Sequence, residues 1–183
     1  GHKFHAPKGV GGLYVRGSKT ALRLPALLHG GGHEKGLRSG TLNVFGISAM
    51  GYAAHLAAEE MNANAKKVGK LRDALEAELL RIEGACVNGS TAHRLHNVTN
   101  LYFPGVDAEA LFLSLPDLAL SNGSACSSAS LEPSHVLKAM GRSDDEAFQS
   151  VRFSLSAFNT EKEIQTTARA VRQAVEEMRE MIY

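Results

Sequence analysis

A lysine at the start of the sequence has the setting that covalent amine chemistry needs. Lys3 follows Gly1 and His2 and precedes a Pro/Gly-rich turn at 7–9. An amine that is held rigidly and partly removed from water loses its proton more easily, and the neutral amine is the form that makes an imine with a carbonyl carbon. We therefore expect Lys3 to be partly desolvated, although most lysines in surface loops are simply solvated.

The second chemical group is a thiol among small residues. Cys126 lies in the segment 121–130, which reads Ser-Asn-Gly-Ser-Ala-Cys-Ser-Ser-Ala-Ser. These neighbours lack the bulk to bury a thiol, and amides and hydroxyls can stabilise a thiolate, so the segment favours an exposed nucleophile. The alternative for any free cysteine is a small buried apolar residue. We apply that interpretation to Cys86, which has no polar neighbours in a strand-like segment.

An arginine between apolar residues is the third candidate. Arg152 lies in Val-Arg-Phe-Ser-Leu, a strand-like sequence in which a guanidinium is costly to bury unless it is paired. Its partner is either an internal Asp or Glu, or the carboxylate of a substrate held by two parallel hydrogen bonds. The sequence leaves both alternatives open.

A glycine-rich segment before a helical pattern is the fourth candidate. Residues 29–41 contain three consecutive glycines and end at Thr41. Backbone amides and a hydroxyl at the start of a helix can bind a phosphate. The spacing of a nucleotide-binding loop is absent, and His29 and His33 lie on glycine-rich backbone rather than on one helix face, so we do not expect zinc there.

Composition limits the class of protein. The chain has 183 residues, a formal net charge of +1 and 44% hydrophobic residues. A near-neutral net charge argues against nucleic-acid binding. The sequence contains no run of about 18 apolar residues, so it predicts no membrane-spanning helix. Two cysteines are too few for a disulfide scaffold, and no leader-like segment opens the sequence, so we expect a reducing compartment.

The helices and strands that must position these groups are predicted from the spacing of apolar residues and from the positions of Gly, Pro and capping residues. A Gly-rich apolar run at 9–16 predicts a strand, and 43–83 predicts a long helix with a break or kink at Gly51 or Gly69. Beyond it, short strands and helices alternate. The expected strands are 85–87, 98–103, 118–120 and 151–155, and the expected helices are 108–115 capped by Asp107, 133–140 with Pro133 at its first position, and a final helix to Met181 capped by Thr160 with Glu163.

Four motifs in a fixed order resemble one known family. They are Gly-His-Lys at 1–3, Gly-Gly-Gly-His-Glu-Lys-Gly-Leu-Arg-Ser-Gly-Thr at 30–41, Ser-Asn-Gly-Ser-Ala-Cys-Ser-Ser-Ala-Ser-Leu-Glu-Pro at 121–133 and Val-Arg-Phe-Ser-Leu at 151–155. The sequence closely resembles the C-terminal half of a NifS/IscS-type cysteine desulfurase, a class-V aminotransferase that uses pyridoxal 5'-phosphate (PLP). The resemblance runs from residue 1 to the last helix.

The resemblance implies an α/β fold that is the C-terminal part of an aspartate-aminotransferase-like PLP-dependent transferase. Residues 1–60 would end the large parallel-sheet domain that binds PLP. Residues 61–183 would form the small α+β domain, with the boundary inside the long helix.

It also implies roles for single residues. Lys3 would hold PLP through an imine, with Gly1 and His2 beside the cofactor and His2 at its phosphate. Thr41 would reach a PLP phosphate in the partner subunit of a homodimer. Arg152 would bind the carboxylate of the substrate, L-cysteine.

Cys126 would take the sulfur and become a persulfide, leaving L-alanine. The acceptor would be an iron–sulfur scaffold or a sulfur carrier for tRNA thiolation, and Cys126 could help to ligate a nascent cluster through its persulfide. The location would be the cytoplasm, or a mitochondrial or plastid matrix in a eukaryote.

The same resemblance implies what these residues lack. In the family the phosphate-binding turn, the side chain that stacks on the PLP ring and the acid that pairs with the pyridine nitrogen precede the lysine. We therefore expect this chain by itself to bind PLP poorly and to turn over little cysteine. Selenocysteine lyase or a related PLP lyase is the alternative within the fold, and a non-catalytic dimerisation or docking fragment is the alternative outside enzymes.

Overall fold

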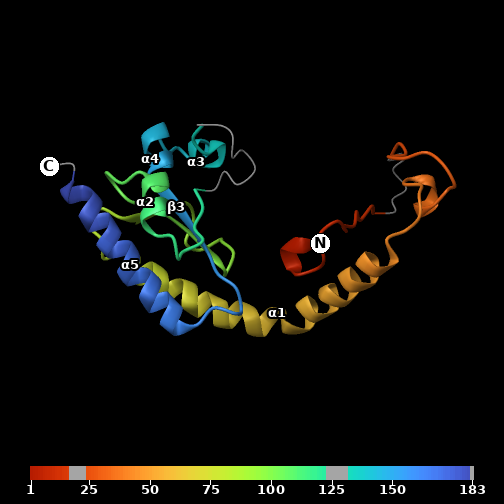
Figure 1. Ribbon diagram of the computed structural model, residues 1–183, viewed down its shortest axis with the longest axis horizontal. Helices are drawn as coiled ribbons and strands as arrows, with labels where there is room; N and C mark the ends of the chain where they lie inside the picture. The colour runs from red at the N-terminus through yellow and green to blue at the C-terminus, as the bar shows by residue number, and fades with distance from the viewer. Residues whose placement is uncertain (17–23, 123–131, 182–183) are drawn as a thin grey trace. The chain divides into compact units, whose positions relative to one another are not determined.

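The computed structural model describes residues 1–16, 24–122 and 132–181 (Figure 1). They form two compact units, Gly1–Met61 and Asn62–Tyr183. Helix α1 (Val44–Leu79) contributes its first part to one unit and the remainder to the other.

The first unit consists of short turns and the beginning of α1. The 3-10 helix η1 (His2–Phe4) opens it, and a second one, η2 (Glu34–Gly36), follows the three glycines. An isolated parallel bridge joins Leu28 to Arg38. Among the described residues of this unit there is no extended strand, and so no part of a parallel sheet.

The strand predicted over residues 9–16 is therefore wrong. Leu13 and Tyr14 are 80% and 83% exposed, and no described segment of the unit pairs with them as a neighbouring strand. A strand is stable when its N–H and C=O groups pair with a second strand. Apolar sequence alone does not supply that partner.

The long helix forms where it is predicted. Its first turn is capped by Asn43, whose Oδ1 accepts from the N–H of Gly46 at 3.1 Å. The helix runs without interruption from Val44 to Leu79, so a break at Gly51 or Gly69, one of the two irregularities expected there, is absent. Each glycine costs about 1 kcal/mol relative to alanine, which the many Ala, Leu and Glu residues of this segment offset.

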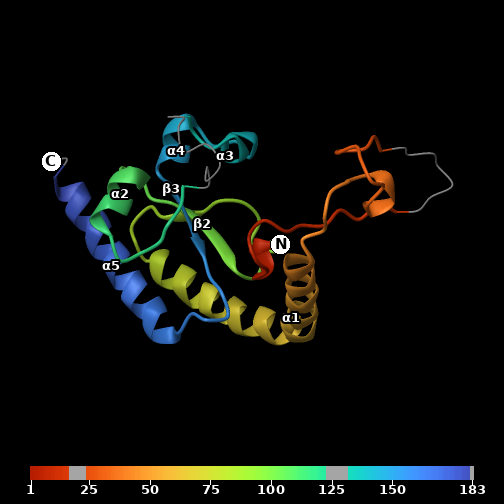
Figure 2. The same ribbon diagram turned by 45° about the vertical axis from the view of Figure 1, so that its right-hand side comes forward.

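The second unit is built on a three-stranded antiparallel sheet in the order β1-β2-β3, with β1 Cys86–Val87, β2 Val98–Tyr102 and β3 Ser150–Ser154. Alternate residues of β2 and β3 point to opposite faces. One face is buried against the end of α1 and against α5 (Glu161–Glu180), and Figures 1 and 2 show these two helices side by side under the sheet. The core residues include Val68, Leu71, Leu75, Leu79, Leu101, Phe103, Val151, Phe153, Val171 and Val175.

The structure confirms two helix caps that were predicted from the sequence. The carboxylate of Asp107 accepts from the N–H of Ala110 at the start of α2 (Ala108–Ser114). Thr160 and Glu163 form the expected capping box at the start of α5. These caps depend on residues within one turn, so local sequence determines them.

Three details differ from the prediction. Residues 118–120 form no strand, and the antiparallel bridge lies one residue later, between Ser121 and Arg152. Helix α3 (His135–Ala139) begins after Ser134, whose hydroxyl accepts from a backbone N–H of the first turn, so Pro133 precedes the helix. The short helix α4 (Asp144–Phe148), with its own capping box, was not predicted.

No helix in the described part of the chain is long and apolar enough to cross a bilayer.

Candidate active site

Lys3 is carried by a tight turn at the start of the first unit. The N–H groups of Phe4 and Ala6 both donate to the carbonyl of Gly1, at 3.1 and 3.3 Å. A Cβ on Gly1 would lie 2.9 Å from the Cβ of Ala6 and 3.2 Å from the Sδ of Met50. Glycine is therefore required for this close approach, and the turn holds the backbone of Lys3 in place.

The side chain of Lys3 is solvent-exposed, as are those of its neighbours His2 and Phe4. Within the described part of the chain, no group forms a hydrogen bond or ion pair with the Lys3 ammonium. The desolvation predicted for this lysine is not present in the unit, because no described segment covers it. Backbone hydrogen bonds hold the turn, and an accessible primary amine fits a cofactor that bonds through an aldehyde.

The glycine-rich segment uses part of its hydrogen-bonding capacity internally. The N–H of Gly32 donates to the Oγ of Ser39 at 3.2 Å, and the Nη1 of Arg38 donates to the carbonyls of Gly40 and Thr41. Thr41 is exposed and precedes the start of α1 by three residues. Its hydroxyl is therefore available to a phosphate, but the segment is not a complete phosphate-binding loop within this unit.

Arg152 lies on β3 in the second unit. Its side chain is half-buried, and its Nη2 donates to the Oγ of Ser121 at 3.4 Å. Its Nε is buried and has no hydrogen-bond partner. No Asp or Glu of the described residues forms an ion pair with it, so the internal ion pair that the sequence left open is not found there. A buried donor without an acceptor favours a carboxylate ligand, which would satisfy the guanidinium.

A hollow of about 430 Å³ lies at Arg152. Its lining comes from the segment 88–95, β2 and β3. The residues that line it are Asn88, Gly89, Ser90, His93, Arg94, Leu95, Val98, Thr99, Asn100, Arg152 and Ser154. Asn88 and Asn100 line the hollow, and the sequence analysis did not identify either of them. The alternation of side chains along β2 could have indicated Asn100, because it places this residue on the same face of the sheet as Arg152.

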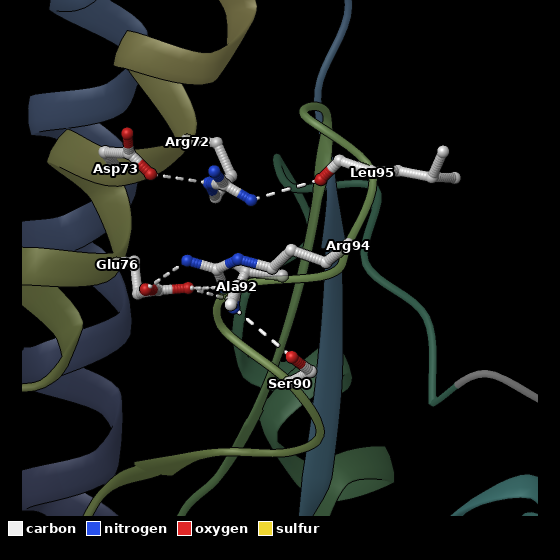
Figure 3. A network of polar contacts seen from close by, with 8 residues as sticks. Arg72, Asp73, Glu76, Ser90, Ala92, Arg94 and Leu95 are labelled. Carbon is white, nitrogen blue, oxygen red and sulfur yellow. Dashed lines mark hydrogen bonds and ion pairs between the residues drawn. The ribbon is translucent and has the colours of Figure 1, made fainter.

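An ion pair fixes the wall of this hollow (Figure 3). The guanidinium of Arg94 holds the carboxylate of Glu76 on α1 with two hydrogen bonds, one of them 2.8 Å long, and the hydroxyl of Thr99 donates to the same carboxylate. One turn earlier, Arg72 donates to the carbonyl of Leu95 at 3.1 Å. Helix α1 thus holds the segment 88–95 from two adjacent turns.

The ion pair between Arg94 and Glu76 changes the pKa of the carboxylate. The hydrogen bond from Arg94 is the main cause that lowers the pKa of Glu76 below its ordinary value of 4.5, and Thr99 contributes in the same direction while burial opposes it. The carboxylate side chain is 11% exposed and the guanidinium 17%. Glu76 is therefore charged at neutral pH, and the charge of Arg94 is neutralised.

Cys126 lies outside the described residues, so its predicted exposure remains a prediction. Cys86 is described, and it is half-buried rather than buried. The Nη2 of Arg142 lies 3.1 Å from its Sγ, and the guanidinium also packs 5.4 Å from the ring centre of Tyr102. The interpretation of Cys86 as a thiol without polar neighbours is therefore wrong, since Arg142 comes from a distant part of the chain.

No group of three His, Cys, Asp or Glu side chains that could hold a metal ion exists among residues 1–16, 24–122 and 132–181. His29 and His33, four residues apart, belong to no such group. The sequence-based argument against zinc at this pair rested on their glycine-rich backbone.

Comparison with known proteins decides the family. The model of the aminotransferase class-V family matches residues 1–167. The chain belongs to this family. Among curated members, cysteine desulfurase IscS of Shewanella sp. strain ANA-3 is 48% identical over 181 residues, and IscS of Mannheimia succiniciproducens is 50% identical over the same length. Each match covers 99% of this class-V aminotransferase chain and 45% of the relative.

Solved structures agree with the family assignment. A NifS-like protein aligns with a TM-score of 0.82 at 34% identity, over 96% of this chain and 44% of its own. A NifS-like protein from Rickettsia africae aligns with a TM-score of 0.74 at 31% identity, over 84% and 41%. These similarities confirm the expected fold class, the C-terminal part of a PLP-dependent transferase fold. The chain spans less than half the length of the relatives that it matches.

Proposed function

We propose that this class-V aminotransferase chain is the C-terminal part of a cysteine desulfurase, which converts L-cysteine to L-alanine and a protein persulfide. The chain's similarity to two IscS proteins along 99% of its length supports the proposal. The structural observation that carries it is Arg152, a half-buried guanidinium that lines a hollow and whose Nε has no partner. An amino-acid carboxylate is the ligand that would satisfy this group.

The residues of the first unit suit PLP. Lys3 would hold the cofactor through its accessible amine, His2 and Gly1 would lie beside it, and Thr41 would donate its hydroxyl to a phosphate in a homodimer. PLP, when bound, supplies an electron sink for the α-carbon of an amino acid. Released from that bond, the Lys3 amine would move the α-proton, which requires the neutral amine.

The second unit would bind the substrate and take its sulfur. Arg152 would orient the substrate through its carboxylate. The thiolate of Cys126 would attack the substrate sulfur, so that an S–S bond forms while the C–S bond breaks. The carbon is reduced to the methyl group of alanine and the two sulfurs share the oxidation as a persulfide, which balances atoms and electrons without a further reagent.

The remaining assignments extend the same proposal. The persulfide would pass to an iron–sulfur scaffold or a sulfur carrier in the cytoplasm, and Cys126 could transiently ligate a nascent cluster. Residues 1–60 would belong to the large domain and 61–183 to the small one.

A chimera tests the function. In it, this chain replaces the matched residues of IscS from Shewanella, so that the rest of the relative supplies whatever lies outside the matched part. We expect PLP-dependent release of alanine from L-cysteine, with persulfide on Cys126 detected by mass spectrometry. A folded, PLP-loaded chimera that releases no alanine would reject the proposal, and faster release from selenocysteine without a Cys126 persulfide would favour the lyase.

The 183 residues alone should behave differently from the chimera. The matched part is 45% of the relative's length, and the part described here leaves Lys3 exposed. We expect PLP added to this chain to be trapped on Lys3 by borohydride at a small fraction of the occupancy seen in the chimera. Full occupancy, measured by intact mass, would show that these residues suffice to build a PLP site.

A further inference from the structure

The sheet of the second unit carries a row of polar side chains on the face away from the core. Asn100 on β2 lies directly opposite Arg152 on β3, and both are half-buried. The backbone N–H of Asn88, just beyond β1, donates to the carbonyl of Asn100 at 2.8 Å, which places the three residues side by side across the sheet. All three line the hollow.

A chain of hydrogen bonds determines the orientation of the first asparagine. The backbone carbonyl of Glu146 can only accept, so the hydroxyl of Ser150 donates to it, at 2.6 Å. The oxygen of Ser150 must then accept from Asn88, whose Nδ2 lies 2.9 Å away. Asn88 is 9% exposed, so its amide has little freedom to turn.

The same chain determines the orientation of Asn100. The second hydrogen on the Nδ2 of Asn88 goes to the Oδ1 of Asn100, at 2.6 Å. Since the oxygen of Asn100 accepts from Asn88, its Nδ2 is the atom left to donate to another group, and Asn100 lies opposite Arg152 on β3. Within the described part of the chain, this Nδ2 has no hydrogen-bond partner.

We propose that Asn100 is a substrate-binding residue, which donates its amide N–H to the carboxylate that Arg152 binds. The inference rests on the proposed function and deepens it. A carboxylate has two oxygens, and here a guanidinium and an amide donor lie on neighbouring strands. The hydrogen-bond chain from Glu146 excludes the opposite orientation of the amide, in which an oxygen would repel the carboxylate.

The arrangement predicts a substrate class. A ligand must carry a carboxylate to satisfy both donors, so amino acids bind and the corresponding amines do not. Without the carboxylate, the Nε of Arg152 gains no acceptor, so the amine lacks the interaction that favours binding of the amino acid.

Binding is tested first on the full 183-residue chain, without cofactor. Titration with L-alanine, followed by ¹⁵N NMR, should shift the side-chain NH₂ resonances of Asn100 and the Nε–H of Arg152. Ethylamine, which lacks the carboxylate, should leave both unchanged. Shifts in Arg152 without shifts in Asn100 would overturn the inference.

Kinetics of the chimera provide the second test. Asn100→Asp keeps the shape and the acceptor for Asn88 but replaces the donor by a charged oxygen. We expect KM for L-cysteine to rise about hundredfold in N100D and about tenfold in N100A, the latter for one hydrogen bond to a charged group, with kcat changed less than about twofold. Asn62→Asp makes the same chemical change at an exposed position of α1 outside the hollow, so it is the matched control and should leave KM unchanged.

The outcomes separate the two proposals. Unchanged KM in N100D, in a chimera that turns over cysteine, overturns the role of Asn100 and leaves the proposed function intact. No turnover by the unsubstituted chimera rejects the proposed function, while an alanine-dependent shift of Asn100 in the isolated chain would still support its carboxylate-binding role.

Discussion

Replacing Lys3 by alanine in the chimera is expected to abolish cysteine turnover, with a loss of about a thousandfold or more. The amine would serve twice, as the covalent anchor of PLP and as the group that moves the α-proton, and proton transfer by a positioned group alone is worth about 10²–10⁴-fold. The turn that carries Lys3 rests on backbone hydrogen bonds to Gly1, so removal of the side chain should not disturb it. Alanine release is the measurement.

Cys126→Ser is the matched comparison for this prediction. It should keep the visible absorbance of lysine-bound PLP, which Lys3→Ala removes, but form no persulfide. The two variants therefore lose activity for separable reasons. Unimpaired persulfide formation in K3A, or retained sulfide production by C126S without an added thiol, would contradict the assigned roles.

The substitution Glu76→Ala is expected to cause a large loss of stability in the second unit. Breaking a buried ion pair from one side leaves the other charge unpaired, and this costs about 3–5 kcal/mol. Here Arg94 would lose the carboxylate that it contacts twice, and Thr99 would lose its acceptor. We expect a loss of about 3 kcal/mol in the free energy of unfolding of the second unit, measured by urea denaturation.

Asp73→Ala is the control on the same helix. Asp73 pairs with Arg72, but its side chain is 62% exposed, and exposed pairs contribute about 0–1 kcal/mol. The double variant Glu76→Ala/Arg94→Ala should recover part of the loss, because it leaves no buried charge unpaired. Equal losses in the free energy of unfolding from Asp73→Ala and Glu76→Ala would show that the buried pair contributes no more to stability than the exposed pair.

The same pair gives stability a defined pH dependence. The folded-state pKa of Glu76 is lowered, so its contribution is fully present above the ordinary value of 4.5 and is lost as the pH falls through the folded-state pKa. The difference in stability between wild type and Glu76→Ala should therefore shrink below about pH 4. A difference that is constant through the acid range would contradict the assignment of the lowered pKa to this carboxylate.

Local sequence determined several parts of this protein directly. Asp107, Thr160 and Glu163 predicted helix starts correctly because a cap satisfies N–H groups within its own turn. Strands β2 and β3 were placed to within one residue, since alternation of apolar and polar positions is a property of the segment itself. The family was predicted from four short motifs in order, and the match over residues 1–167 confirmed it.

Only the tertiary structure decided which side chains meet. The apolar run at 9–16 makes no strand because no described segment pairs with it, and Lys3 is exposed because no described segment covers it. Cys86 gains Arg142 from 56 residues away, and Asn100 takes its orientation through Asn88 and Ser150. Caps and alternation are short-range and can be read along the chain, whereas strand pairing, desolvation and the polarity of a hydrogen-bond chain depend on partners that folding brings from distant positions.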